Sequence, residues 1–300
     1  MRRGWVAVLL ILGACRQSAD RPIRIGSKNF SEQVLLGEIA ARGLESRGIR
    51  VDRRLNLGGT FICHQALKAG ELDLYPEYTG TAFTAILARK PVSDPRRVFD
   101  EVGREYLKRW NLVWSPPLGF ENTFALVMRG DDARRLGIRK ISDLAAHPDT
   151  RPGFGYEFLE REDGFPGLAK TYGLNFSERP AQMDLGLLYT ALQSRKVDLV
   201  AGNSTDGLID AIGGVVLEDD RRYFPPYEAA FVVRGEVWKR PEVRGFLESL
   251  AGAIDAATMR KMNAAVDKDK RRPEDVAKEF LASLSKSVIP RSGATRNPPS

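Results

Sequence analysis

The sequence predicts an α/β protein built from two lobes. From Ile23 to Tyr75, short apolar segments that suit strands alternate with segments whose apolar residues recur near the helical period. The same alternation restarts after Phe120, and a chain of 300 residues is long enough to divide into two hydrophobic cores. Strands and helices in alternation predict a sheet covered by helices in each lobe.

The first lobe is expected to begin with a strand in which Ile23 and Ile25 alternate with polar residues. After the next turn the apolar residues Val34, Leu35, Ile39 and Leu44 recur near the helical period, which indicates a helix. Further elements are expected, in chain order, as a strand at 50–57, a helix at 61–69 and a strand at 72–75. After Phe120 they are a strand at 124–128, a helix at 185–193, strands at 198–201 and 228–234, and helices at 243–254 and 274–284.

The N-terminus has the pattern of an export signal. Met1–Arg3 carries positive charge, and the apolar stretch that follows is too short to span a bilayer, for which about twenty residues are needed. The stretch closes on Leu12-Gly13-Ala14-Cys15, which resembles a bacterial lipobox. That resemblance implies that residues 1–14 are a lipoprotein signal peptide and that Cys15 carries lipid; an ordinary secretory signal is the alternative. Either reading places the protein in the bacterial cell envelope, on the periplasmic or extracellular face of a membrane.

The charge pattern argues against a nucleic-acid-binding protein, and the cysteine content argues against a disulfide-stabilised fold. The formal charge of +7 comes from basic residues that are interleaved with acidic ones, which argues against a nucleic-acid partner. Cys63 has no second cysteine to pair with once Cys15 is acylated, so no disulfide framework is expected. Residues 289–300 are rich in Pro, Ser and Arg and are predicted to be a disordered tail.

Three strand-to-helix turns carry the candidate binding residues, because ligands of α/β sheets lie beyond the carboxyl ends of strands. In the first turn, Asn29 is expected to cap a helix and Glu32 to complete a capping box, which would display Lys28 beside the helix N-terminus, where it suits a carboxylate. In the second turn, at Leu57–Thr60, the threonine is expected to cap the next helix.

The third turn, Asp73–Thr81, contains the most distinctive residues. Pro76 and Gly80 bracket the expected start of a helix and would leave Tyr78 and Thr81 exposed at its mouth. The face of an aromatic ring attracts a quaternary ammonium group. The turn therefore predicts a site for a methylated cation.

These turns resemble the glycine betaine/choline/carnitine-binding proteins of osmoprotectant ABC importers. The resemblance covers essentially the whole chain after the signal. It rests on the motifs Gly26–Gln33, Leu57–Thr60, Asp73–Thr81, Glu121–Leu126, Phe158–Gly164, Ser204–Gly207 and Phe224–Tyr227.

The resemblance implies a type II periplasmic-binding-protein clamshell, in which each lobe is a mixed sheet flanked by helices. Residues 22–121 plus 226–288 would form lobe I and residues 122–225 lobe II. In such proteins an aromatic box holds the trimethylammonium group and basic and hydroxyl groups hold the carboxylate. The positions that correspond to the box are Tyr78, Phe124, Asn203 and Tyr227, and those that correspond to the carboxylate site are Lys28, Thr81 and Arg161. The implied partners are a betaine-type solute and the permease and ATPase subunits of an ABC importer, with a lipid anchor to the membrane.

Two positions depart from the pattern of the family. Phe124 keeps a ring and loses a hydroxyl, whereas Asn203 replaces an aromatic face by an amide, which binds polar groups better than methylated cations. Another residue could close the box, or the ligand could be a larger betaine, such as carnitine or ergothioneine, with a polar group near Asn203. The prediction is therefore a glycine betaine, choline or carnitine type of ligand, and a larger betaine or an amino acid is the alternative.

Other classes of function have less support. His64 and His147 are the only histidines, and neither belongs to a catalytic or metal-binding pattern, so we expect no enzyme, no cofactor and no metal site. An amino-acid ligand would need a carboxylate aimed at its ammonium group, for which Asp206 and Glu121 are candidates. A purely structural lipoprotein would bind none of these ligands.

Overall fold

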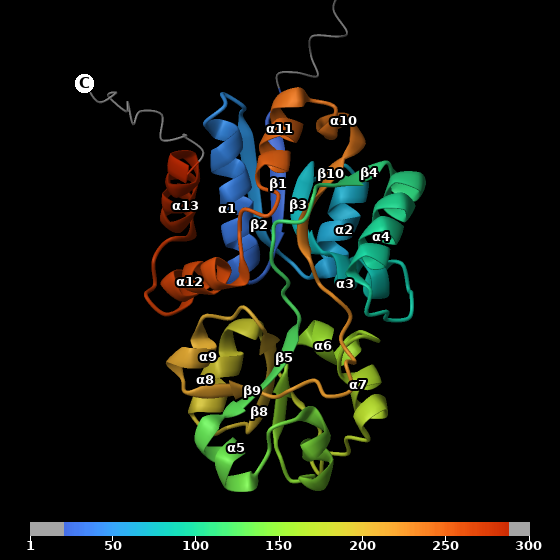
Figure 1. Cartoon of the computed structure of the whole chain (residues 1–300), viewed down its shortest axis with the longest axis vertical. Coiled ribbons are helices and arrows are strands. Elements are labelled where there is room, and N and C mark those ends of the chain that lie inside the picture. The colour runs from blue at the N-terminus through green and yellow to red at the C-terminus, as the bar shows by residue number, and fades with distance from the viewer. Residues whose placement is uncertain (1–20, 288–300) are drawn as a thin grey trace, which may run out of the picture.

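The computed structural model describes residues 21–287, which form two lobes, one above the other in Figure 1. The expected signal peptide, the lipid acceptor Cys15 and the tail at 289–300 lie outside the described residues. Each lobe contains a five-stranded mixed sheet flanked by helices, which confirms the predicted fold class. None of the helices within residues 21–287 is long and apolar enough to cross a membrane.

Lobe I, as named here, is the part of the chain built around the sheet of order β2-β1-β3-β10-β4. Strands β1, β2 and β3 run parallel, and β10 pairs antiparallel with both β3 and β4. Its strands are β1 (Ile23–Lys28), β2 (Val51–Gly58), β3 (Leu74–Tyr78), β4 (Leu112–Trp114) and β10 (Ala229–Arg234).

Helices cover both faces of this sheet. One hydrophobic core lies between the sheet and α1, α11, α12 and α13, and a second lies between the sheet, α2 and α4. The helices of lobe I are α1 (Ser31–Glu45), α2 (Thr60–Lys68), α3 (Thr79–Thr81), the π-helix η1 (Ala82–Ile86), α4 (Pro95–Trp110), α10 (Gly235–Trp238), α11 (Pro241–Ser249), α12 (Ala256–Asp267) and α13 (Pro273–Ser287).

Lobe II is built around the sheet of order β7-β6-β8-β5-β9. Strands β6, β7 and β8 run parallel, and β5 pairs antiparallel with β8 and β9. Its strands are β5 (Phe124–Arg129), β6 (Pro152–Phe154), β7 (Ala181–Gln182), β8 (Leu199–Asn203) and β9 (Gly214–Val216). Its helices are α5 (Gly130–Leu136), η2 (Ile141–Ala146), α6 (Tyr156–Glu160), α7 (Phe165–Tyr172), η3 (Leu185–Leu187), α8 (Leu188–Gln193) and α9 (Leu208–Ala211).

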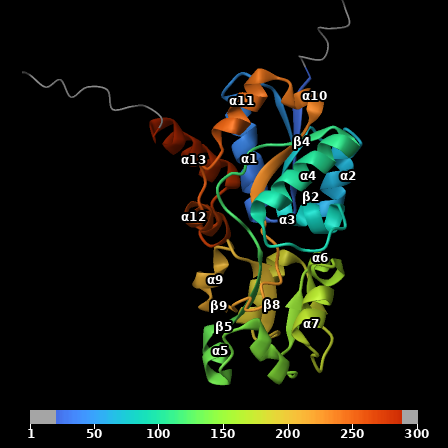
Figure 2. The ribbon, with the colours of Figure 1, turned by 45° about the vertical axis from the view of Figure 1, so that its right-hand side comes forward.

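Two segments connect the lobes, residues 115–123 on the way out and residues 217–228 on the return, and they run next to each other where Glu121 and Glu228 form a β-bridge. The lobes also approach each other on either side of these connections. On one side α12 lies above α9, and on the other α3 lies above α6, as both views show (Figures 1 and 2).

Several local expectations were wrong. Helix α1 begins at Ser31 with Phe30 at its N-cap and no side-chain cap, and Glu32 is buried among polar side chains instead of completing a capping box. Helix α2 is capped by Gly59, and Thr60 is already its first residue. The single helix expected at 185–193 is a short 3-10 turn followed by α8. The longest helix, α4, was not anticipated, although Asp94 caps it and Pro95 occupies its first position.

Candidate functional site

A pocket of about 270 Å³ lies between the two lobes. All seven residues predicted to bind ligand line it: Lys28, Tyr78, Thr81, Phe124, Arg161, Asn203 and Tyr227. They come from β1, β3 and α3 of lobe I, from β5, β8 and the residue after α6 of lobe II, and from the returning connection. Lys28, Tyr78, Thr81 and Asn203 end strands or helices and Arg161 follows one, as expected for ligand-binding residues of an α/β sheet. Phe124 instead begins β5, and Tyr227 lies just before β10.

The aromatic residues of the pocket form two groups of neighbouring rings, one around Phe124 and the other made of Phe30 and Tyr78. The ring centroid of Phe124 lies 6.1 Å from that of Tyr227 and 4.8 Å from that of Phe158. Phe30 stacks on Tyr78 with the ring centroids 6.5 Å apart. Rings at these separations and tilts pack favourably and offer several faces to one small cavity.

The two tyrosines are held by their hydroxyl groups. Tyr78 donates to Oε1 of Glu32 at 2.6 Å, and Tyr227 donates to Oδ2 of Asp163 at 2.7 Å. Burial, and then the neighbouring carboxylate, raises the pKa of each tyrosine far above its usual value, so both phenols stay neutral. Tyr78 belongs to β3 and is 4 % exposed, and Thr81 ends α3 and is 3 % exposed, which corrects the expectation that both stand exposed at a helix mouth.

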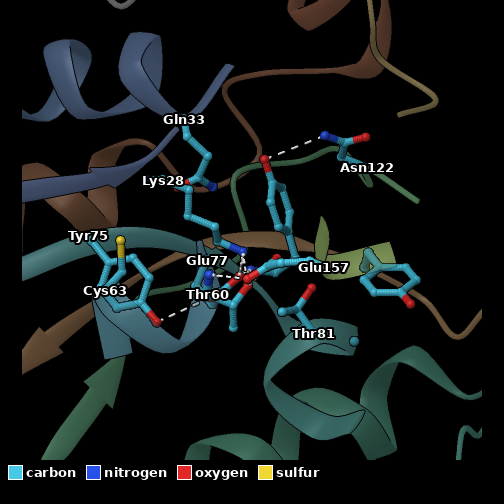
Figure 3. A network of polar contacts seen from close by, with 12 residues as sticks. Lys28, Gln33, Thr60, Cys63, Tyr75, Glu77, Thr81, Asn122 and Glu157 are labelled. Carbon is cyan, nitrogen blue, oxygen red and sulfur yellow. Dashed lines mark hydrogen bonds and ion pairs between the residues drawn. The ribbon is translucent and has the colours of Figure 1, made fainter. Parts of the chain in front are cut away.

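Lys28 is buried in an ion pair, which corrects the expectation that it is displayed on a turn. Its Nζ lies 2.5 Å from Oε1 of Glu77 and 3.1 Å from the hydroxyl of Thr60, and Figure 3 shows the three side chains meeting. Glu77 is itself held by the backbone N–H of Tyr78 at 2.7 Å and by the hydroxyl of Tyr75. The lysine is thereby fixed at the pocket wall, with its Nζ 5.0 Å from the centroid of the Tyr78 ring.

Arg161 is also held in place by side chains of the protein itself. Its guanidinium group makes two bonds to Asp163, one of them 2.8 Å long, and reaches the hydroxyl of Thr81 at 3.4 Å. Burial opposes ionisation of Asp163, but the guanidinium group outweighs that effect and lowers the pKa of the carboxyl. Nη1 of the same group lies 3.5 Å from Oε2 of Glu157, so an anionic ligand would bind beside two carboxylates, through the N–H groups that they leave free.

Asn203 lies directly opposite Phe124 in the pairing of β5 with β8. Its backbone N–H and its side-chain amide both donate to Asp206, at 2.8 and 3.3 Å. Phe30 also lines the pocket, and the sequence reasoning missed it as a site residue. An aromatic residue in the same turn as Lys28 was the signal that could have identified it.

Contacts between the lobes close the pocket on two sides. On the α6 side, Glu157 accepts from the N–H and the hydroxyl of Thr60, and Asp163 accepts from the hydroxyl of Thr84 at 2.6 Å. On the α12 side, Thr205 of lobe II donates to Glu32 at 2.6 Å. The structure therefore shows the two lobes in contact around the pocket.

The remaining candidates of the sequence lie elsewhere. Glu121 is exposed on the connection, and Asp206 accepts hydrogen bonds from the hydroxyl of Tyr189 and from the backbone and side chain of Asn203. His64 packs between Tyr106 and Trp110 in lobe I. Within residues 21–287, no group of three or more His, Cys, Asp or Glu side chains is placed to hold a metal ion.

The sequence profile of the substrate-binding domains of ABC-type glycine betaine transport systems matches residues 21–283. The chain belongs to this family. Its solved relatives include a structure described as a glycine betaine/carnitine/choline ABC transporter, at 31 % identity and a TM-score of 0.72, which covers 88 % of this chain and 98 % of that one.

Curated proteins similar to this chain are named for different ligands. A glycine-betaine-binding protein of Pseudomonas aeruginosa is 38 % identical, covering 86 % of each chain, and the carnitine transport binding protein OpuCC of Listeria monocytogenes is 32 % identical, covering 88 % of this chain and 87 % of that one. The ergothioneine transport permease/ergothioneine binding protein EgtU of Helicobacter pylori is also 38 % identical, over 88 % of this chain. The chain spans about half the length of the H. pylori protein, 48 %.

Proposed function

We propose that this protein captures a small solute with a trimethylammonium group outside the cytoplasm and delivers it to the permease and ATPase of an ABC importer. The observation that carries the proposal is one pocket lined by three aromatic rings, Tyr78, Phe124 and Tyr227, together with the cationic groups of Lys28 and Arg161. The ring faces suit a cation that cannot donate a hydrogen bond. The cationic groups and the Thr81 hydroxyl suit the carboxylate of a betaine.

Ligand binding would hold the lobes together. We propose that residues 22–121 plus 226–288 and residues 122–225 move as two units about the connections. A ligand that contacts Tyr78 in one unit and Phe124 and Arg161 in the other stabilises the closed arrangement more than the open one. The protein would bind and release its solute without chemical change, so it is not an enzyme.

The proposal is tested with purified protein by calorimetry and thermal melting. Glycine betaine, choline and carnitine are compared with glutamate and lysine, whose ammonium groups demand hydrogen-bond acceptors. A quaternary ligand at one hundred times its Kd should stabilise the protein by about 2.7 kcal/mol. Stabilisation by the amino acids alone would favour an amino-acid receptor, and the absence of any shift would favour a structural lipoprotein.

We also propose that Cys15 anchors the protein in the membrane after removal of residues 1–14, with the mature protein in the cell envelope. The support is the Leu12–Cys15 pattern of the sequence. Intact mass spectrometry of the membrane fraction should find a chain that begins with an acylated Cys15. A soluble chain cleaved at another position would contradict the anchor and leave the binding proposal unchanged.

A further inference from the structure

Glu157, on α6 of lobe II, lines the pocket between the two cationic groups that are proposed to hold a carboxylate. Its carboxylate accepts from the backbone N–H of Thr60 and, at 3.1 Å, from the Thr60 hydroxyl. That hydroxyl accepts from Nζ of Lys28 at 3.1 Å, and Oε2 of Glu157 lies 3.5 Å from Nη1 of Arg161. Figure 3 shows Lys28, Thr60 and Glu157 side by side. Asp184, the other carboxylate that lines the pocket among the described residues, is exposed to solvent.

The two cationic groups already have carboxylate partners without Glu157. Lys28 pairs with Glu77 at 2.5 Å, and Arg161 bonds Asp163 at 2.8 Å. Glu77 and Asp163 are buried, at 0 % and 1 % exposure, whereas the side chain of Glu157 is 34 % exposed. Two cations and three carboxylates leave a formal excess of one negative charge where the carboxylate of a ligand would bind.

The carboxylate of Glu157 also occupies an anion-binding position at the start of α2. The backbone N–H of Thr60, the first residue of this nine-residue helix, has no partner within the helix, and the helix dipole favours an anion there. Gly59 makes room for this contact, because a Cβ at position 59 would lie 2.3 Å from Oε1 of Glu157. A ligand carboxylate that approaches this end of the pocket therefore meets a carboxylate of the protein.

We propose that Glu157 is a specificity-determining residue, whose carboxylate competes with that of a ligand for Thr60 and Arg161. It thereby lowers the preference of the pocket for betaines over quaternary ammonium compounds that lack a carboxylate. This inference rests on the proposed function and deepens it. The competition is electrostatic, because like charges a few ångströms apart oppose each other. The contacts of the trimethylammonium group with the aromatic rings do not depend on it.

The test compares glycine betaine with choline in the wild type and in Glu157→Gln. The two ligands share a trimethylammonium group and differ in that one carries a carboxylate and the other a hydroxyl group. Glutamine keeps the size of the side chain and an acceptor for Thr60, and it removes the charge. We expect the ratio of the affinity for glycine betaine to the affinity for choline, measured by calorimetry, to rise about tenfold in the variant.

This ratio separates specificity from a purely structural role. Glu157 bridges the lobes through Thr60, and loss of that bridge alone lowers both affinities by the same factor. An unchanged or lower ratio in Glu157→Gln, with both ligands still bound, overturns the inference and leaves the proposed function standing. Failure of the wild type to bind either ligand overturns the proposed function, and the inference with it.

Glu160→Gln is the matched control. Glu160 lies on the same helix and is exposed, and it is not among the residues within 21–287 that line the pocket. Its substitution removes the same charge, which solvent screens, so the ratio should stay within about twofold of the wild-type value. An equal rise in both variants would assign the effect to the overall charge of lobe II and overturn the inference. If Glu157→Gln does not fold, as judged by circular dichroism, Glu157→Ala takes its place.

Discussion

Replacing Tyr78 separates the contribution of its ring from that of its hydroxyl. Tyr78→Leu removes the aromatic face, and Tyr78→Phe keeps the face but removes the donor that bonds Glu32 at 2.6 Å. A quaternary ammonium group against a ring from which water is excluded gains about 2 kcal/mol. Loss of this interaction between the ammonium group and the ring weakens binding about 30-fold.

The hydroxyl should matter for stability more than for affinity. In Tyr78→Phe, Glu32 loses one of its four side-chain donors and remains buried. A hydrogen bond to a carboxylate contributes about 1.5–3 kcal/mol, so the free energy of unfolding of the ligand-free protein should fall by about 2 kcal/mol.

Both quantities are measurable on the same samples. Calorimetry with glycine betaine gives the affinity, and urea unfolding of the ligand-free variants gives the stability. We expect Tyr78→Phe to bind within about threefold of the wild type and Tyr78→Leu to bind about 30-fold more weakly. The reasoning is refuted if Tyr78→Leu retains wild-type affinity, or if Tyr78→Phe loses as much affinity as Tyr78→Leu.

Three further predictions concern the carboxylate site, the lobe contacts and acid stability. Thr81→Val, which is nearly isosteric, should lower the affinity for glycine betaine about tenfold in calorimetry. The affinity for choline, which has no carboxylate, should stay unchanged. Equal losses of affinity for both ligands would contradict the placement of the carboxylate at Thr81. Thr84→Val removes the hydrogen bond that the Thr84 hydroxyl of lobe I donates to Asp163. The dissociation rate of glycine betaine, measured by stopped flow, should therefore rise while the association rate changes little. An unchanged dissociation rate would show that this contact does not limit release. Burial lowers the pKa of His64 to about 4, below the unfolded value of about 6.5, so protonation favours the unfolded chain. The contribution of His64 to the free energy of unfolding therefore decreases by about 2 kcal/mol between pH 7 and pH 5. The urea midpoint of His64→Leu should decline less than that of the wild type over this range. Parallel pH profiles of the two proteins would exclude His64 as the cause of the acid destabilisation.

The positions of Lys28, Tyr78 and Thr81 could be predicted because they depend on local order along the chain, whereas Phe124, Arg161, Asn203 and Tyr227 followed only from the resemblance to the family. A turn that follows a strand of an α/β sheet lies at the ligand-binding edge of the sheet. The three turns of the N-terminal segment that are rich in polar and aromatic residues therefore indicated ligand-binding positions. The structure places Lys28, Tyr78 and Thr81 from those turns in one pocket with Phe124 and Arg161 of the other lobe.

The partners of these residues could not be predicted, because they depend on packing between distant segments. Glu32 had the spacing of a capping box, yet its carboxylate bonds Thr205 and Asn263, which are 173 and 231 residues away in the chain. Lys28 was expected on the surface of a turn, yet it is buried in an ion pair with Glu77. Spacing alone does not reveal which buried carboxylate a tertiary fold will bring to a given donor.

The most direct test of the central claim compares glycine betaine with 3,3-dimethylbutanoate, in which carbon replaces the charged nitrogen and shape is kept. Both molecules present the same carboxylate to Lys28 and Arg161, and they differ in the charge that faces Tyr78, Phe124 and Tyr227. Calorimetry should show glycine betaine binding about 30-fold tighter or more, as expected for a cation against aromatic faces. Equal affinity for the two molecules would show that the rings act only as apolar surface and would contradict the account.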